Sequence, residues 1–165
     1  MSSWGQGLND AADRIVDVRL DEKSVIRWRP EIEQERNLAI FDLLERNSFR
    51  LVDGFAGPYA LELSLRDATL CLRVKAHNGE EALDIALPVR PLRRIIKDYF
   101  LICDSYYQAI RGATPSRIET IDMARRSLHN EGSEMLREAL AERVDMDLDT
   151  ARRLFTLVCV LHLRG

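Results

Sequence analysis

The chain has 165 residues and a mass of 19.0 kDa, which fits one domain around a single core. Its 46% hydrophobic and 31% charged residues are typical of neither an intrinsically disordered chain nor a membrane protein, so no membrane partner is expected. The net charge of −3 removes the general attraction to phosphate backbones, so nucleic acid is not an expected partner. Residues 1–90 carry 12 basic and 16 acidic side chains, whereas residues 91–165 carry 12 basic and 11 acidic ones. Only the C-terminal part is therefore not net negative, and an anion site is expected only there.

The N-terminal part is predicted to contain a lead-in, a strand and a helix. Residues 1–13 lack a signal-peptide pattern and are expected to be flexible. Val16, Val18 and Leu20 alternate with polar residues, which predicts a short half-buried strand over 14–20. Pro30 suits a first helical position, and the following helix is expected to end near residue 47. The apolar positions of this helix are Ile32, Ala39, Ile40, Leu43 and Leu44.

Between residues 49 and 87 the apolar residues change to a period of two, which is typical of strands with one buried face. Alternating runs cover 59–65, 70–76 and 83–87. Turn residues separate these runs, first at Asp67 and Ala68 and then from His77 to Gly79, where Gly79 is expected to adopt a positive φ. The pattern predicts an antiparallel meander with one solvated face.

From Pro91 to the end the chain is expected to be helical. Gly112 ends the first of these helices, and Thr114 caps the next one. Asn130 to Gly132 is expected to stop that helix. The predicted elements are helices over 91–111, 115–132, 133–143 and about 149–163, with a short edge strand over 144–148.

This order of elements predicts an α+β fold. It consists of an N-terminal antiparallel meander sheet with one early helix, followed by a C-terminal bundle of about four helices packed on one face. No repeat or linker interrupts the series, so residues 1–165 are expected to form a single domain. Residues 14–90 would form mainly the sheet half and residues 91–165 the helical half.

Several segments resemble a known family. These are ERNLAIFDLLERNSF (35–49), GPYALELSL (57–65), LRRIIKDYFLICDSYYQAIRGATPSRIETIDMARRSLHNEG (92–132) and DLDTARRLFTLVCVLHLRG (147–165). Together they are similar to uncharacterised protein family 0262, a family of conserved hypothetical proteins found mainly in alphaproteobacteria. The resemblance covers most of the chain and implies a cytoplasmic bacterial protein, but it supplies no catalytic residues.

The most informative candidate site lies in the third predicted helix. At 100° per residue, Arg125 falls inside the apolar stripe, so its charge must meet a carboxylate, backbone carbonyls or a bound anion. His129 lies one turn further on the same side, and Arg126 can pair with Asp122. One interpretation is an anion-binding or proton-transfer site formed by Arg125 and His129, with Glu131 as an acid or base. The other is a structural ion pair at a helix C-terminus, where His129 complements the dipole.

A second basic cluster, formed by Arg93, Arg94 and Lys97, lies at the start of the long helix over 91–111. Cations at this end oppose the helix dipole, which is compatible with an anionic partner. The alternative is a solvated face in which Arg94 pairs with Asp98 at i, i+4.

No motif for a cofactor, a metal or a catalytic nucleophile is found, so none is expected. Asp145, Asp147 and Asp149 resemble the start of a calcium loop, but Thr150 stands where glycine is needed. The odd number of cysteines, all within apolar runs, predicts reduced and buried thiols in a cytoplasmic protein. Tyrosines on the long helix are expected to pack in the core.

The last predicted helix is apolar around its whole circumference from Leu154 to Leu163. This segment must therefore be covered, either by other helices or by a second copy of the chain. We therefore expect a cytosolic interaction or regulatory module, homo-oligomeric through this helix, that binds a protein partner or a small anion. Two alternatives are a small enzyme or anion-binding protein using Arg125, His129 and Glu131, and an RNA- or ribosome-associated protein. A pocket opening on Arg125 would favour an enzyme or binder, and an internal carboxylate sealing it would favour the module.

Overall fold

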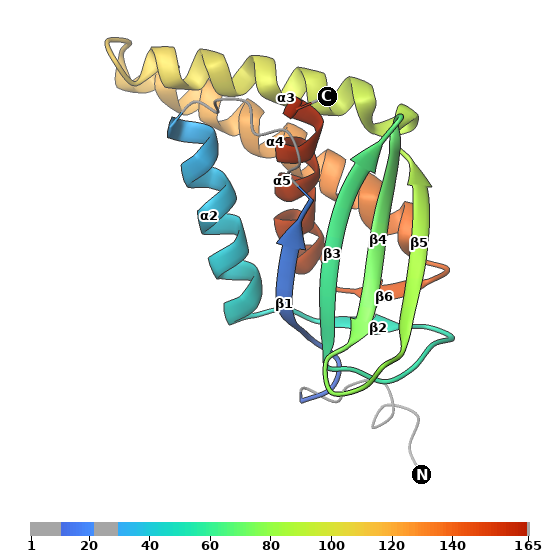
Figure 1. The fold of residues 1–165 in the computed structure, drawn as a ribbon. Coiled ribbons are helices and arrows are strands. Elements are labelled where there is room, and N and C mark those ends of the chain that lie inside the picture. The colour runs from blue at the N-terminus through green and yellow to red at the C-terminus, as the bar shows by residue number, and fades with distance from the viewer. Residues whose placement is uncertain (1–10, 22–29, 165) are drawn as a thin grey trace.

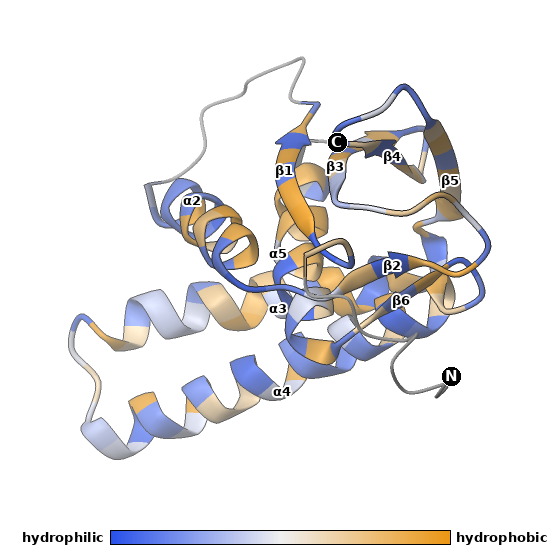
Figure 2. Ribbon diagram, turned by 90° about the horizontal axis from the view of Figure 1, so that it is seen from below, coloured by the Kyte–Doolittle hydropathy of each residue, from blue (hydrophilic) through white to orange (hydrophobic). Residues whose placement is uncertain are grey.

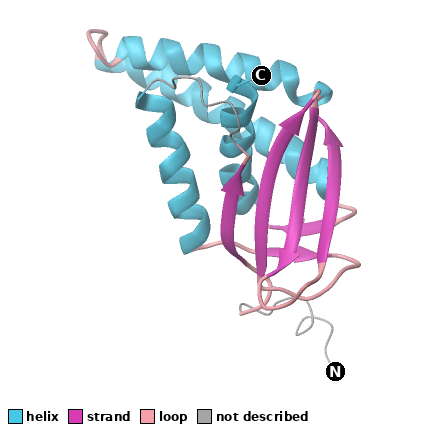
Figure 3. Cartoon of the chain, in the orientation of Figure 1, coloured by secondary structure: helices cyan, strands magenta, loops and turns pink. Residues whose placement is uncertain are grey.

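A computed structural model of the protein describes residues 11–21 and 30–164 (Figure 1). Within these residues the fold is α+β, as predicted, with four helices and six strands (Figure 3). The first ten residues of the predicted flexible lead-in lie outside the described residues. The elements are β1 (Ile15–Leu20), α2 (Pro30–Glu45), β2 (Phe49–Leu51), β3 (Tyr59–Arg66), β4 (Thr69–Ala76), β5 (Ala82–Pro88), α3 (Arg90–Ala109), α4 (Pro115–Leu140), β6 (Val144–Met146) and α5 (Leu148–Arg164).

The main sheet has the strand order β1-β3-β4-β5. The predicted antiparallel meander is confirmed for β3, β4 and β5, in which Leu63 lies opposite Leu72 and Leu72 opposite Ile85. The prediction was wrong for β1, which runs parallel to β3 with Val18 opposite Leu61. A parallel neighbour requires a long crossover connection, and α2 and β2 lie within it.

The buried face of β1 also differs from the prediction. Ile15 is fully buried and Val18 nearly so, whereas Val16 and Leu20 are only partly buried. The cause is a change of register between Ile15 and Asp17, because an extra residue in one strand turns the following side chains to the other face.

The two hairpin turns of the meander use different backbone geometry. Asp67 and Ala68 have φ values of 50° and 64°, which suits the two-residue turn that joins β3 to β4. The expected positive φ at Gly79 is absent. The amide of Ala76 bonds to the carbonyl of Glu81 at 2.9 Å, so the chain reverses over a longer loop and no residue needs the left-handed conformation.

The helices cover one face of the sheet, and α5 is the central element (Figure 1). It packs against α2, α4 and β3, and Figure 2 shows its mainly apolar ribbon between α2 and the strands. Residues 154–161 are buried except for Thr156, which is only partly buried, so the expectation that this segment must be covered is confirmed. The described chain provides that cover by itself.

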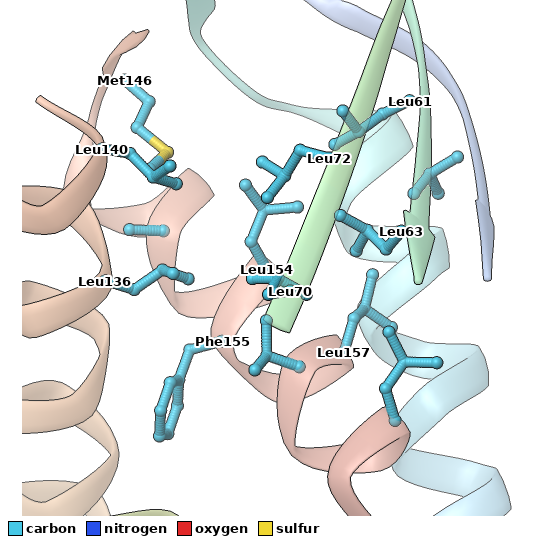
Figure 4. Packing of buried hydrophobic residues seen from close by; sticks show 14 of the residues in the cluster. Leu61, Leu63, Leu70, Leu72, Leu136, Leu140, Met146, Leu154, Phe155 and Leu157 are labelled. Atoms are coloured by element: carbon cyan, nitrogen blue, oxygen red, sulfur yellow. The ribbon is translucent and has the colours of Figure 1, made fainter. Parts of the chain in front are cut away.

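The core forms where α5 meets the sheet and α4 (Figure 4). Leu154 and Leu157 of α5 face the leucines of β3 and β4, and Phe155 points toward α4. Leu136, Leu140 and Met146 close the other side. The short strand β6 was predicted, and its partner is β2, because Phe49 pairs with Met146 in a separate two-stranded sheet.

The predicted break at Gly132 and the separate helix over 133–143 were wrong, because α4 is one continuous helix of 26 residues. Gly132 lies against the ring of Phe155, where a Cβ atom would be 2.5 Å from Cε1 and 2.8 Å from Cε2. A glycine inside a helix costs only about 1 kcal/mol relative to alanine. The close packing of α4 against α5 at this position can therefore compensate for having glycine within the helix. The C-terminal bundle therefore contains three helices, and α2 is the fourth.

None of the helices in the described part of the chain is long and apolar enough to cross a membrane.

Candidate anion-binding site

A cavity of about 430 Å³ lies where α2, α3, α4 and α5 meet. The helices bring together side chains that are far apart in the sequence, because α2 and α4 both pack against α5. The charged side chains that line the cavity are Glu35, Asp42, Arg125, Arg126, Arg152 and Arg153. With four guanidinium groups and two carboxylates, the lining carries net positive charge.

Arg125 is partly buried, with 26% of its side chain exposed, and it has an internal partner. Its Nε and Nη2 atoms donate to the same oxygen of Asp122 at 3.1 and 2.6 Å. The guanidinium carbon lies 4.7 Å from the centre of the Tyr106 ring, a cation–π contact. The expected partner is thus a carboxylate from the same helix, yet Arg125 still contributes to the cavity wall.

Asp122 holds two arginines at once. The predicted pair with Arg126 is confirmed at 2.9 Å, in addition to the contact with Arg125. Hydrogen bonding from Arg125, together with the positive charges of both arginines, lowers the pKa of the Asp122 carboxyl. Asp122 therefore remains ionised and fixes both guanidinium groups on the cavity side of α4.

His129 lines the cavity one turn after Arg125. Its Nε2 atom lies 2.8 Å from the Thr156 hydroxyl, and that hydroxyl donates to the carbonyl of Arg152 at 3.2 Å. Because a carbonyl can only accept, both contacts are satisfied when Nε2 carries the proton and donates to Thr156. The ring is 5.2 Å from Tyr99 and 5.3 Å from Phe155, centre to centre.

Burial, and then the charges of Arg152, Arg125 and Arg153, lower the pKa of His129 to about 4. The imidazole is therefore neutral at pH 7. It cannot add positive charge to the site, and it cannot act as a proton donor in the way that a histidinium would.

We predict that this histidine makes the protein less stable as the pH falls from about 6.5 to about 4. In the unfolded chain histidine titrates near 6.5, so in this window the unfolded state binds more protons than the folded state. Unfolding free energies of wild type and His129→Gln should be measured by denaturant titration between pH 7.5 and 5. The wild type should lose stability relative to the variant by less than about 1.4 kcal/mol per pH unit, the limit for one proton.

His77 provides the matched control, because it is exposed in the loop between β4 and β5. His77→Gln should follow the wild-type curve. Parallel curves for wild type and His129→Gln would show that the protonation of His129 is the same in the folded and unfolded states.

Arg152 and Arg153 lie on α5 and were not selected from the sequence as site residues. Their nearest carboxylates are Asp149 at 3.9 Å and Asp42 at 4.0 Å, beyond hydrogen-bond distance. One sequence pattern could have revealed them. The polar residues at positions 149, 152, 153 and 156 recur at helical spacing and form a stripe on an otherwise apolar helix.

Glu35 was also missed as a site residue. It lies on α2, and its two oxygens accept hydrogen bonds from the hydroxyls of Tyr107 at 2.8 Å and Tyr99 at 3.4 Å. Burial and the charge of Glu35 raise the pKa values of both tyrosines. No local pattern distinguishes Glu35 from its neighbours Glu31 and Glu33, because the tyrosines that select it lie more than 60 residues away.

Several predicted site residues do not join the cavity. Glu131 is exposed, because two residues after His129 a helical side chain points to the other side of α4. Arg93, Arg94 and Lys97 are exposed at the start of α3, outside this cavity. The predicted ion pair between Arg94 and Asp98 is not formed in the part of the chain that the structure describes.

The donor groups of the site do not suit a metal or a thiol nucleophile. Among residues 11–21 and 30–164, no three histidine, cysteine or acidic side chains are arranged to hold a metal ion. Cys103 and Cys159 are unpaired and buried. Burial and the nearby Glu35 raise the pKa of Cys103 to about 12, and burial raises that of Cys159, so neither forms a reactive thiolate at neutral pH.

Comparison with known proteins identifies the family. The sequence model of the Uncharacterised protein family (UPF0262) matches residues 12–164. UPF0262 proteins from Brucella canis and Brucella abortus (strain S19) are 57% identical over 153 residues, covering 92% of this chain and 95% of each relative. A UPF0262 protein from Mesorhizobium japonicum is 54% identical over 160 residues, covering 96% of this chain and 99% of the relative. No solved structure matches the chain. The resemblance inferred from the sequence is therefore confirmed, and the chain belongs to UPF0262.

Proposed function

We propose that this protein is a cytoplasmic binding module that recognises an anionic group of a small molecule in the four-helix cavity. The proposal rests mainly on the weak ion pairing of Arg152 and Arg153. Both guanidinium groups line the cavity, and their carboxylate partners are at 3.9 and 4.0 Å. Good charge-assisted hydrogen bonds are shorter, about 2.7–2.9 Å, so an incoming oxyanion can bind these donors more closely than Asp149 and Asp42 do.

Arginine is suited to this task. Its planar guanidinium can present two parallel N–H groups to a carboxylate or a phosphate. Asp122 fixes Arg125 and Arg126 on the neighbouring wall formed by α4, which lowers the entropy that these long side chains lose on binding. The cavity would thus combine two preorganised arginines on α4 with two weakly ion-paired arginines on α5.

The site favours recognition over bond-making. A general acid or base works best with a pKa near the operating pH, and His129 has a pKa of about 4. Glu131, the other group considered for proton transfer, is exposed outside the cavity. The buried thiols are not activated, so we do not propose an enzyme.

Other aspects of the proposal rest on composition and burial. Free cysteines agree with a reducing cytoplasm. The net charge of −3 does not favour an RNA or ribosome partner. Oligomerisation through residues 154–163 would need a free apolar surface, and the chain already covers 154–161. A small anion is therefore favoured over a protein partner docked on α5.

The proposal is tested by thermal and chemical unfolding with phosphate, sulfate and citrate, using chloride at equal ionic strength as the reference. At about 100 times its Kd, a ligand that binds only the folded state stabilises it by about 2.7 kcal/mol. For a domain of this size that corresponds to a rise in Tm of about 5–10 °C. The double variant Arg152→Gln/Arg153→Gln should lose most of this rise.

Arg93→Gln/Arg94→Gln is the matched control, because it removes the same charge from an exposed part of α3 outside the cavity. This variant should respond to the oxyanion like wild type. Equal stabilisation of wild type and the Arg152/Arg153 variant would exclude the cavity as the binding site. Absence of stabilisation by all three oxyanions would refute the proposal.

A further inference from the structure

We infer that the ligand of the cavity is bipolar, with an oxyanion held by Arg152 and Arg153 and an ammonium group held by Glu35. This inference rests on the proposed function and specifies its ligand class. It follows from the separation of opposite charges along the cavity, which can be traced on α2.

The α2 wall of the cavity has two charged ends. Glu35 and Asp42 both line it, with Ala39 between them. They are seven residues apart on one face of the helix, so their backbone positions are separated by about 10 Å at 1.5 Å per residue. Asp42 lies 4.0 Å from Arg153, which places the cationic end of the cavity beside Asp42. Glu35 marks the other end.

The carboxylate of Glu35 has no ion-pair partner within 4.0 Å in the described part of the chain. Its hydrogen-bond partners are the hydroxyls of Tyr99 and Tyr107, which donate hydrogen bonds but carry no charge. Arg125 is held by Asp122 and stacks on Tyr106, so it is not in an ion pair with Glu35. No described lysine, arginine or histidine lies within 4.0 Å of this carboxylate.

A carboxylate without an ion-pair partner in an anion-binding cavity selects between ligands. A simple dianion that filled the cavity would be repelled by Glu35, whereas a ligand that places an ammonium there would gain an ion pair in a partly buried position. Tyr99 lines the same cavity and donates to Glu35, so its hydroxyl helps to hold the carboxylate in place for an ammonium group. The expected class is a small amino-phosphate or amino-carboxylate with its charges far apart.

The test compares probes that differ in a single group. Affinities of inorganic phosphate, hexyl phosphate, aminohexyl phosphate and aminoethyl phosphate should be measured by calorimetry. Aminohexyl phosphate should bind about tenfold more tightly than hexyl phosphate, which has the same chain length but no amine. It should also bind about tenfold more tightly than aminoethyl phosphate, which is too short to span the cavity.

Glu35→Gln should abolish the advantage of aminohexyl phosphate and leave the affinity for hexyl phosphate equal or higher. Glutamine retains an oxygen that can accept from Tyr107, and an unchanged Tm would confirm that the variant is folded. Glu33→Gln is the control, because it removes the same charge from an exposed position on α2 outside this cavity.

The two proposals fail in different ways. If hexyl phosphate binds in a manner that depends on Arg152 and Arg153 but the amine adds nothing, the bipolar ligand is refuted and the anion site stands. The same conclusion follows if Glu35→Gln keeps the preference for the amine. If no phosphate probe binds, the proposed function itself is overturned.

Discussion

Gly132→Ala is expected to lower the free energy of unfolding by up to about 2 kcal/mol, because overpacking a core typically costs about 1–3 kcal/mol and alanine recovers part of this cost through its helix propensity. The new methyl group would meet the Phe155 ring, with Cε1 at 2.5 Å and Cε2 at 2.8 Å from an ideal Cβ, and α4 and α5 would have to move apart. The higher helix propensity of alanine offsets only about 1 kcal/mol. Urea denaturation followed by circular dichroism would measure the change.

Gly112→Ala is the matched control, because a Cβ at this position has no atom within 4 Å. We expect this variant to change stability by less than about 0.5 kcal/mol. Phe155→Leu provides the second arm of a double-mutant cycle, and Gly132→Ala should cost less in that background if the ring is the obstacle. A Gly132→Ala variant as stable as wild type would show that the two helices can separate freely.

Asn47→Leu is expected to destabilise the fold by about 3 kcal/mol, because buried backbone groups lose their hydrogen-bond partner. The side-chain oxygen of Asn47 accepts from the amide of Ile15 at 2.7 Å, and its nitrogen donates to the carbonyls of Ile15 at 2.9 Å and Leu43 at 2.8 Å. The side chain therefore joins the end of α2 to the start of β1. Leucine has a similar size but leaves backbone groups of Ile15 unpaired next to a fully buried side chain, at about 1–3 kcal/mol for each buried group.

Asn37→Leu is the control for Asn47→Leu. Asn37 is exposed on α2, and its contact with Arg36 is on the surface. We expect this change to have little effect on the unfolding midpoint. Hydrogen exchange at Ile15 gives a local readout, because its amide should exchange faster in Asn47→Leu. Unchanged protection there would contradict the role assigned to Asn47.

Local periodicity predicted the elements of this fold well, because it records which side of each segment is buried. The alternation over 59–87 indicated β3, β4 and β5, and the apolar circumference of α5 indicated a fully covered helix. The pairing of β1 was not predictable in the same way. Nothing within residues 15–20 specifies whether the neighbouring strand runs parallel or antiparallel, since that depends on where α2 packs.

Gly132 shows why a residue type can be ambiguous in sequence. Glycine is common at helix ends, and it is also retained where two helices approach closely. Only the position of Phe155, 23 residues later in the chain, distinguishes the two cases. The predicted helix end was wrong for this reason.

The sequence by itself determined that Arg125 and His129 share one side of a helix and that Arg125 requires a partner, because both follow from helical spacing and the cost of burying a charge. The tertiary structure decided that Glu35, Arg152 and Arg153 complete the cavity wall. Those residues lie on α2 and α5, and helices so distant in the chain are brought together only by the packing of their apolar faces, which single-residue patterns do not encode.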